Sequence, residues 1–261
     1  VWVGTQNVAG LNLPKTPATV VISDTDPHGL TTMAEGAGAT TPLKPSLQSA
    51  SGMVDFRALI DLRGVYVSSG GNTFYGNAAT QGSKENVTPA TAGASLVLGY
   101  ISSFGGNMGI AGVWSNSAQV DKGVWPGRGQ KTFNAGAANN PSGPFWVRAV
   151  INPSANAVTG VDGVSYAAGT CATMYSTDGS TWTTIYSNSV AQGGFNASQT
   201  QDWWVGASTL KGLRTLKFVA YDGDRLMANP DFTGLAAGTT SFTDTASTPN
   251  TWTVVGPAVI A

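Results

Sequence analysis

Hydrophobic and polar residues alternate along several short segments, which is the pattern of β-strands with one buried face. Residues 54–63, VDFRALIDLR, carry apolar side chains at every second position, with Leu59 as the one interruption. The same alternation occurs in FWVRAVI at residues 145–151 and in LKFVAY at residues 216–221. We therefore predict three sheet strands here, each with one face in a hydrophobic core.

Clusters of Gly, Asn and Ser separate these segments, for example SSGGNT, SSFGGN and NAGAANNPSGP. Such residues form the turns between strands. No window shows a sustained helical stripe, and no repeat of about 40 residues is evident, which argues against a propeller. The pattern predicts an all-β protein built as a sandwich or a barrel.

Two hairpins are predicted from turn and strand residues. In YSTDGSTWTTI, Asp178 and Gly179 favour a two-residue turn, which would pair Tyr175 with Trp182 across the strands. We interpret Asp178 as a turn residue rather than a functional carboxylate. A second hairpin is expected within residues 241–255, where a Phe and a Trp flank a loop rich in Asp, Ser, Pro and Asn.

Composition limits the function classes. The 261 residues are 41% hydrophobic, enough for one large β domain or two small ones, but only 10% are charged and the net charge is -1. The 13 Lys and Arg residues are scattered against 14 acids, so a nucleic-acid partner is not expected. No apolar run reaches about 18 residues and the first residues lack the pattern of a signal peptide, so neither a membrane span nor a standard secretion signal is expected.

Catalytic constellations are weak in this sequence. Cys171 is the lone cysteine, cannot form an internal disulfide, and is expected to be a buried, inert thiol in a strand. A retaining glycosidase needs two carboxyl groups about 5 to 5.5 Å apart. The two glutamates, Glu35 and Glu85, lie in loop-like segments, and Asp55 and Asp61 stand roughly 20 Å apart along one strand. We expect no catalytic residues.

Metal and cofactor sites are not expected either. The acidic doublets are SDTDP, with Asp24 and Asp26, and YDGD, with Asp222 and Asp224. Neither resembles an EF-hand loop. Asp residues in such settings commonly bond to their own backbone in turns, which is the interpretation we favour.

Tryptophan supplies the best case for ligand contact, since the chain has eight. Trp114, Trp125 and Trp203 lie in or beside Gly/Asn/Ser-rich segments, where an exposed indole can stack on a sugar ring or form a subunit interface. Packing in the sandwich core is the alternative for each. Trp204 should point to the face opposite Trp203.

The C-terminal half resembles a known family. Three segments occur in a characteristic order: Trp146-Val147-Arg148, then Tyr175, Ser176, Asp178, Gly179 and Trp182, then GLRTLKFVAYDGDRLMANPDFTGLAAGTTSFTDTASTPNTWTVVGPAVI. This order resembles concanavalin A-like (laminin G-like) jelly-roll domains of bacteriophage tail proteins, especially of phages of actinobacteria. The resemblance extends over about residues 145 to 260, is weak over residues 51–144, and has no counterpart before that.

This resemblance implies a two-sheet antiparallel jelly-roll sandwich, a place on the virion surface and no catalysis. The expected function is that of a non-catalytic structural virion protein of a tailed phage, either a minor tail protein or a capsid decoration protein. Its expected partners are other virion proteins, further copies of itself as a homo-oligomer, and host-surface carbohydrate. The alternatives are a glycan-degrading hydrolase on the same fold and a bacterial surface adhesin.

Residues 1–50 have no counterpart in the family pattern. Four of the 13 prolines, at positions 14, 17, 42 and 45, bracket one strand-like run, ATVVISDT. We predict an N-terminal arm over residues 1–50 that takes part in assembly, followed by the sandwich domain at residues 51–261. The alternative is that this segment supplies the first strands of the sandwich in the same chain.

Overall fold

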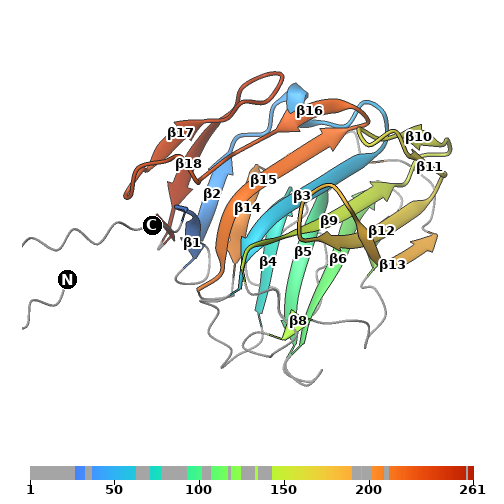
Figure 1. The fold of residues 1–261 in the computed structure, drawn as a ribbon. Helices are drawn as coiled ribbons and strands as arrows, with labels where there is room; N and C mark the ends of the chain where they lie inside the picture. Colours follow the sequence, from blue (N-terminus) through green and yellow to red (C-terminus); the bar gives the residue numbers. More distant parts are fainter. Residues whose placement is uncertain are drawn as a thin grey trace, which may run out of the picture.

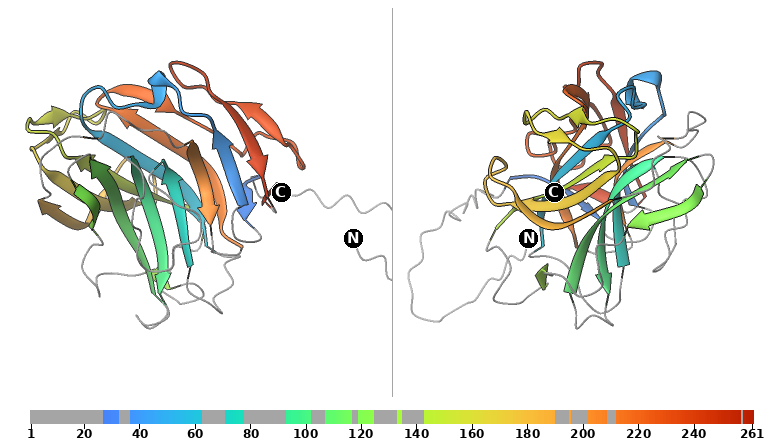
Figure 2. Two further views of the ribbon diagram at one scale, coloured as in Figure 1. Left: turned by 180° about the vertical axis from the view of Figure 1, so that it is seen from behind. Right: turned by 90° about the vertical axis from the view of Figure 1, so that its right-hand side faces the viewer.

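The computed structural model describes residues 27–32, 37–62, 71–77, 93–101, 107–116, 119–124, 133–134, 143–189, 195, 202–208, 212–256 and 258–261. In this part of the chain, two large antiparallel sheets pack face to face (Figure 1). The further views show the two layers from behind and from the side (Figure 2). The predicted all-β sandwich is therefore confirmed.

The first sheet, which we call sheet A, has the strand order β13-β12-β9-β3-β15-β1-β19, with β16 paired to β15. Its strands are β1 (Leu30–Thr32), β3 (Val54–Asp61), β9 (Phe145–Asn152), β12 (Thr170–Ser176), β13 (Thr183–Ser189), β15 (Arg214–Asp222), β16 (Arg225–Ala228) and β19 (Ala258–Ile260). The three strands expected from alternation are β3, β9 and β15, which are neighbours in this sheet.

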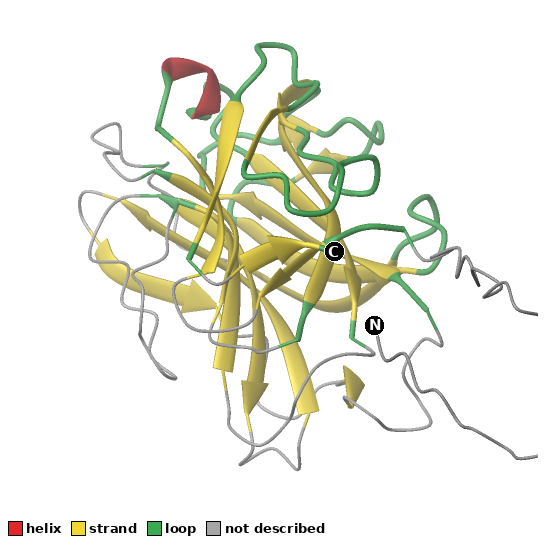
Figure 3. Ribbon diagram, turned by 90° about the vertical axis from the view of Figure 1, so that its left-hand side faces the viewer, coloured by secondary structure: helices red, strands yellow, loops and turns green. Residues whose placement is uncertain are grey.

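The second sheet, sheet B, has the order β17-β18-β2-β14-β4-β5-β6-β7, with β8 paired to β6. Its strands are β2 (Ala37–Thr41), β4 (Gly71–Gly76), β5 (Ala94–Ile101), β6 (Asn107–Asn116), β7 (Gln119–Val124), β8 (Phe133–Asn134), β14 (Trp203–Ser208), β17 (Ser241–Thr243) and β18 (Thr251–Val255). A separate two-stranded ribbon contains β10 (Val158–Thr159) and β11 (Ser165–Tyr166). One short 3₁₀ helix, η1 (Pro45–Leu47), stands out among the strands in Figure 3.

The core lies between the sheets and is built from the alternating apolar residues. Phe56 of β3 and Phe218 of β15 are both fully buried. From sheet B, Trp203 meets Phe56 edge-on with ring centroids 5.6 Å apart, and Tyr75 stacks on Phe218 at 5.7 Å. Large aromatic side chains from both sheets therefore interlock, and their burial supplies much of the driving force for folding.

The predicted domain boundary at residue 50 is wrong for residues 27–50. β1 lies inside sheet A, paired with both β15 and β19, and β2 lies inside sheet B, paired with both β14 and β18. Leu30 and Ala39 are fully buried. This segment supplies strands of the sandwich in the same chain, which was the alternative interpretation. Residues 1–26, including the strand-like run ATVVISDT, lie outside the described residues.

The hairpin predicted within residues 241–255 is confirmed, with Phe242 of β17 directly opposite Trp252 of β18. Asp244 organises the loop between them. Its carboxylate accepts hydrogen bonds from the Trp252 indole at 2.9 Å and from the Asn250 backbone N–H at 2.8 Å. The acidic side chain of this loop is thus a buried structural anchor.

Candidate functional site

The outer face of sheet A, turned away from the core, carries a cluster of charged and aromatic side chains. Alternation along β3 predicts that Asp55 and Asp61 point away from the core, and they do so, but both are nearly inaccessible to solvent. A second small apolar cluster covers this side of the sheet, where Tyr166 of β11 packs with Val150 and Met174. The outer face of sheet A is therefore partly covered by other side chains and is not fully exposed to solvent.

Asp55 is the centre of the cluster. Its carboxylate accepts two hydrogen bonds from Arg148 of β9, from Nε at 2.8 Å and from Nη2 at 2.7 Å. Arg57 of β3 donates to the same carboxylate, through Nη2 at 2.6 Å and Nε at 3.2 Å. One buried carboxylate thus holds two guanidinium groups.

Arg148 is enclosed by further partners. Its Nη2 also bonds to Asp162 at 2.8 Å, and its guanidinium carbon lies 5.2 Å from the centre of the Trp182 ring. Burial raises the pKa of Asp162, but hydrogen bonds from Tyr166 and Arg148 outweigh that effect and lower it. The Arg148 side chain, 1% exposed, fixes the β10–β11 ribbon to the sheet through Asp162.

Arg57 occupies a more open position, with 14% of its side chain exposed. Its guanidinium carbon lies 5.5 Å from the Trp182 ring centre and 5.0 Å from the Tyr221 ring centre. Tyr221 belongs to β15 on one side of β3, whereas Trp182 precedes β13 on the other side. We call Trp182, Arg57 and Tyr221 the cation–aromatic patch. These contacts stabilise the cation and hold its orientation.

The hairpin that provides Trp182 differs from the prediction in its register. Tyr175 pairs with Thr183, not with Trp182, because the connection is wider than two residues. Oδ1 of Asp178 accepts hydrogen bonds from the backbone N–H groups of Ser180 at 2.8 Å and Thr181 at 2.7 Å, which closes this longer turn. Gly179 does have the positive φ expected of the turn, at 74°. The register shift frees Trp182 to contact the arginines.

Trp203, predicted as a candidate glycan or interface contact, is instead a core residue that is only 2% exposed. Trp204 is half-buried, as its neighbouring place on β14 leads one to expect. Trp114 lies in β6, but its side chain is outside the described part of the structure, and Trp125 lies outside the described residues altogether.

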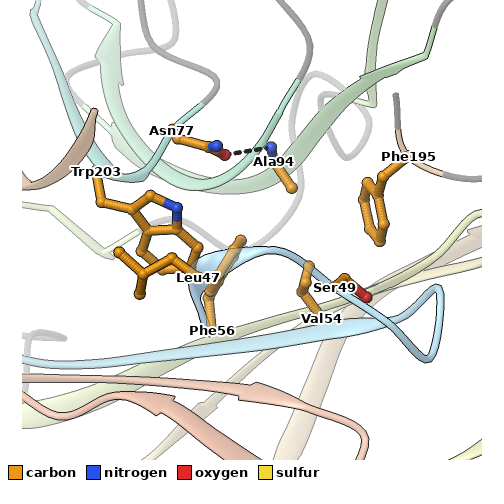
Figure 4. Close-up of a pocket in the computed structure, with 8 residues that line it drawn as sticks. All are labelled: Leu47, Ser49, Val54, Phe56, Asn77, Ala94, Phe195 and Trp203. Carbon is orange, nitrogen blue, oxygen red and sulfur yellow. Dashed lines mark hydrogen bonds between the residues drawn. The ribbon is translucent and has the colours of Figure 1, made fainter. Parts of the chain in front are cut away.

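A small cavity of about 10 Å³ adjoins Trp203 between the sheets (Figure 4). Leu47, Phe56 and Phe195 line it together with the indole. The indole N–H is buried without a hydrogen-bond partner among the described residues. A space of this size holds at most about one water molecule and excludes a sugar ring.

Two further buried carboxylates, Asp61 and Asp222, hold parts of the fold together. Asp61 pairs with Arg214 at 2.7 Å, and Asp222 binds Arg225 at 2.8 Å together with the loop at residues 49–51. Both glutamates lie outside the described residues.

Within the described part of the chain, no three His, Cys, Asp or Glu side chains gather as metal ligands. No described helix is long and apolar enough to cross a membrane.

Sequence reasoning missed the cation–aromatic patch. Arg57 and Tyr221 occupy outward positions of β3 and β15, so the alternation of these strands placed both on the same face. Their meeting with Trp182 depends on the strand order of sheet A and on the register of the β12–β13 hairpin, which no local pattern in the sequence records.

No protein-family model and no curated protein sequence matches the chain. Among solved structures, the chain is similar to a scytalido-glutamic peptidase in complex with a peptide-based transition-state analogue. The TM-score is 0.30 at 6% sequence identity, covering 87% of this chain and 97% of that chain. A likeness of this degree carries no inference about activity.

Proposed function

We propose that this chain is a non-catalytic structural protein of a tailed-phage virion, and that it contacts host-surface glycan through the outer face of sheet A. The observation that carries the glycan contact is the cation–aromatic patch, in which Arg57 lies between the rings of Trp182 and Tyr221. Aromatic rings offer apolar faces to the C–H groups of a sugar, and a guanidinium donates hydrogen bonds to its oxygens.

The place on a virion is supported by the sequence resemblance over residues 145–260. Two features within that region agree with a structural rather than a catalytic role. Asp178 closes a turn, and Asp244 anchors the β17–β18 loop. Each carboxylate already has a structural task, so neither is available as a general acid or base without loss of its local fold.

Immunogold electron microscopy with antibodies against the whole chain tests the virion assignment. We expect labelling of purified phage particles, and binding of the purified 261-residue protein to cell-wall polysaccharide without release of reducing ends. Release of reducing ends would establish the hydrolase alternative, and labelling of uninfected bacteria in place of particles would establish the adhesin.

A pair of variants tests the location of the glycan contact. Trp182→Ala removes one side of the patch and should weaken polysaccharide binding. Val259→Ala changes an exposed apolar residue on β19, at the opposite edge of sheet A, and should bind like the unaltered protein. Equal binding by all three proteins would place the contact elsewhere.

A further inference from the structure

We propose that the ligand of the cation–aromatic patch is an acidic saccharide whose carboxylate is bound by the unused Nη donors of Arg57. This inference rests on the proposed glycan contact and narrows it to sugars that carry a uronic acid or a similar carboxylated group.

Arg57 uses only one of its two pairs of hydrogen-bond donors to bind the protein. A guanidinium has five N–H donors, which can form a side-on pair from Nε and one Nη, and an end-on pair from the two Nη atoms. Arg57 uses Nε and Nη2 to bind Asp55. Its Nη1 has no hydrogen-bond partner recorded among the described residues, so an end-on fork remains for a second carboxylate.

Arg148 shows what a purely structural arginine looks like in this sheet. Its Nε and Nη2 bind Asp55, Nη2 also binds Asp162, and Nη1 approaches the sulfur of Met174 at 3.7 Å. Its side chain is 1% exposed, compared with 14% for Arg57. The two arginines share one carboxylate, but only Arg57 combines unused donors with access to solvent.

The surroundings of Arg57 prepare it for binding. Asp55 holds one edge, and the rings of Trp182 and Tyr221 flank the guanidinium, so little side-chain freedom remains to be lost when a ligand binds. Both ring centres lie within 5.5 Å of the guanidinium carbon, close enough for a pyranose attached to the bound carboxylate to pack against one of them. A planar carboxylate matches the planar fork.

The charge balance favours a carboxylate over a phosphate. The two carboxylates of the cluster, Asp55 and Asp162, balance the charges of its two guanidinium groups, so only the unused donors of Arg57 remain for a ligand. The neighbouring cation on β15, Lys217, already pairs with Asp231 at 3.2 Å. One arginine with free donors therefore suits a single negative charge, whereas phosphate sites in proteins commonly gather several donors.

The test uses one polysaccharide in three forms. Host cell-wall polysaccharide is measured untreated, after carbodiimide–borohydride reduction of its carboxyl groups to alcohols, and after hydrofluoric acid removal of its phosphates. We expect carboxyl reduction to weaken binding of the 261-residue protein about tenfold or more, since a charge-assisted bidentate contact is lost. Dephosphorylation should leave the binding unchanged.

The outcomes separate this inference from the proposed function. Equal binding of the untreated and carboxyl-reduced forms would overturn the acidic ligand and leave the glycan contact standing. Loss of binding only after dephosphorylation would identify a phosphate ligand and also overturn the inference. Absence of binding to every form would refute the glycan contact itself, and the acidic ligand with it.

Variants assign the effect to Arg57. Arg57→Gln should reduce the preference for the untreated over the carboxyl-reduced form to near unity. Arg57→Lys keeps the charge but lacks the paired donors, so it should also lose most of that preference. It replaces the Gln variant in the test if the Gln variant does not fold. Lys217→Gln removes a nearby cation and should keep the preference. A preference that persists in both Arg57 variants, or disappears in the Lys217 variant, would show that Arg57 is not the carboxylate ligand.

Discussion

Arg57 and Arg148 stand directly opposite each other on β3 and β9, as Cα partners in the antiparallel register. Like charges at such positions repel each other. The pair is stable because Asp55, fully buried, lies within bonding distance of both guanidinium groups, at 2.6 Å and 2.7 Å. Sheet A is therefore held at its centre by one carboxylate between two cations.

Replacing Asp55 by Asn should destabilise the protein by about 3–5 kcal/mol, because Arg57 then loses its carboxylate partner and the buried Arg148 keeps only Asp162. Urea unfolding followed by tryptophan fluorescence measures this. Asp231→Asn is the matched control, since it breaks an ion pair whose carboxylate is 43% exposed. Its cost should stay below about 1 kcal/mol. Similar losses in the two variants would contradict the central role of Asp55.

The turn at Asp178 and Gly179 gives a second prediction. Gly179→Val should cost roughly 1–3 kcal/mol because φ is 74° there, in a region that β-branched residues rarely adopt. An added Cβ would also lie 2.8 Å from the indole nitrogen of Trp146. Thermal unfolding measures the loss.

Asp178→Asn serves as the comparison for this turn. Oδ1 of Asp178 accepts hydrogen bonds from Ser176, Ser180 and Thr181, and an amide oxygen can do the same. Stability and polysaccharide binding should therefore be preserved. A folded Asp178→Asn protein without binding would show that this carboxylate has a functional task.

Local patterns were sufficient to predict the strands but not their neighbours. Alternation located β3, β9 and β15, and composition placed Phe242 and Trp252 in one hairpin, because period-two burial and turn residues are recorded within a few positions of sequence. The adjacency of β1 and β15, about 180 residues apart in the chain, depends on the packing of the whole sandwich.

The positions of the tryptophan side chains also could not be predicted from local sequence patterns. Trp203 lies among small and polar residues in the sequence, yet its ring fills the core against Phe56. Trp182 was expected to pair with Tyr175, but side-chain bonds in the turn shift the register by one residue. Sheet topology decides whether an aromatic ring is buried or exposed. The residues that flank the ring within one strand do not carry that information.

A truncation now tests the role of residues 27–45. Deleting residues 1–45 removes β1 and β2, which bridge β15 to β19 and β14 to β18. The product should fail to fold, as circular dichroism and a loss of cooperative unfolding would show. Deleting residues 1–26 alone removes no described strand and should give a folded protein. A soluble, cooperative product of the longer deletion would contradict the observed strand order.

Cys171 provides a probe of the core. It is 2% exposed, and burial raises the pKa of its thiol to about 12. Only a thiolate reacts readily with disulfide reagents, so the native protein should remain unlabelled at pH 8 and become labelled after denaturation. Rapid labelling of the native protein would show that this part of the sandwich opens.

Asp222 should make the stability of the folded protein depend on pH, and a variant at this position can test that dependence. Burial raises its pKa, but bonds from Ser51, the Ala50 N–H and Arg225 outweigh burial and lower it. A carboxyl group whose pKa is lower in the folded state stabilises that state above its unfolded value of about 3.9, and this stabilisation is lost as the pH falls through the folded value.

Asp222→Asn should therefore cost about 2–3 kcal/mol at pH 7, since charge-assisted bonds to the loop at residues 49–51 and to Arg225 are weakened. The difference from the unaltered protein should shrink as the pH falls from the unfolded pKa of about 3.9 through the lower folded pKa, because the carboxyl group binds a proton first in the unfolded state and then in the folded state. Asp224→Asn, at the exposed neighbouring position of the same turn, should follow the unaltered protein throughout. Urea unfolding between pH 7 and acid measures both variants, and a constant difference across that range would mean that Asp222 acts by shape rather than by charge.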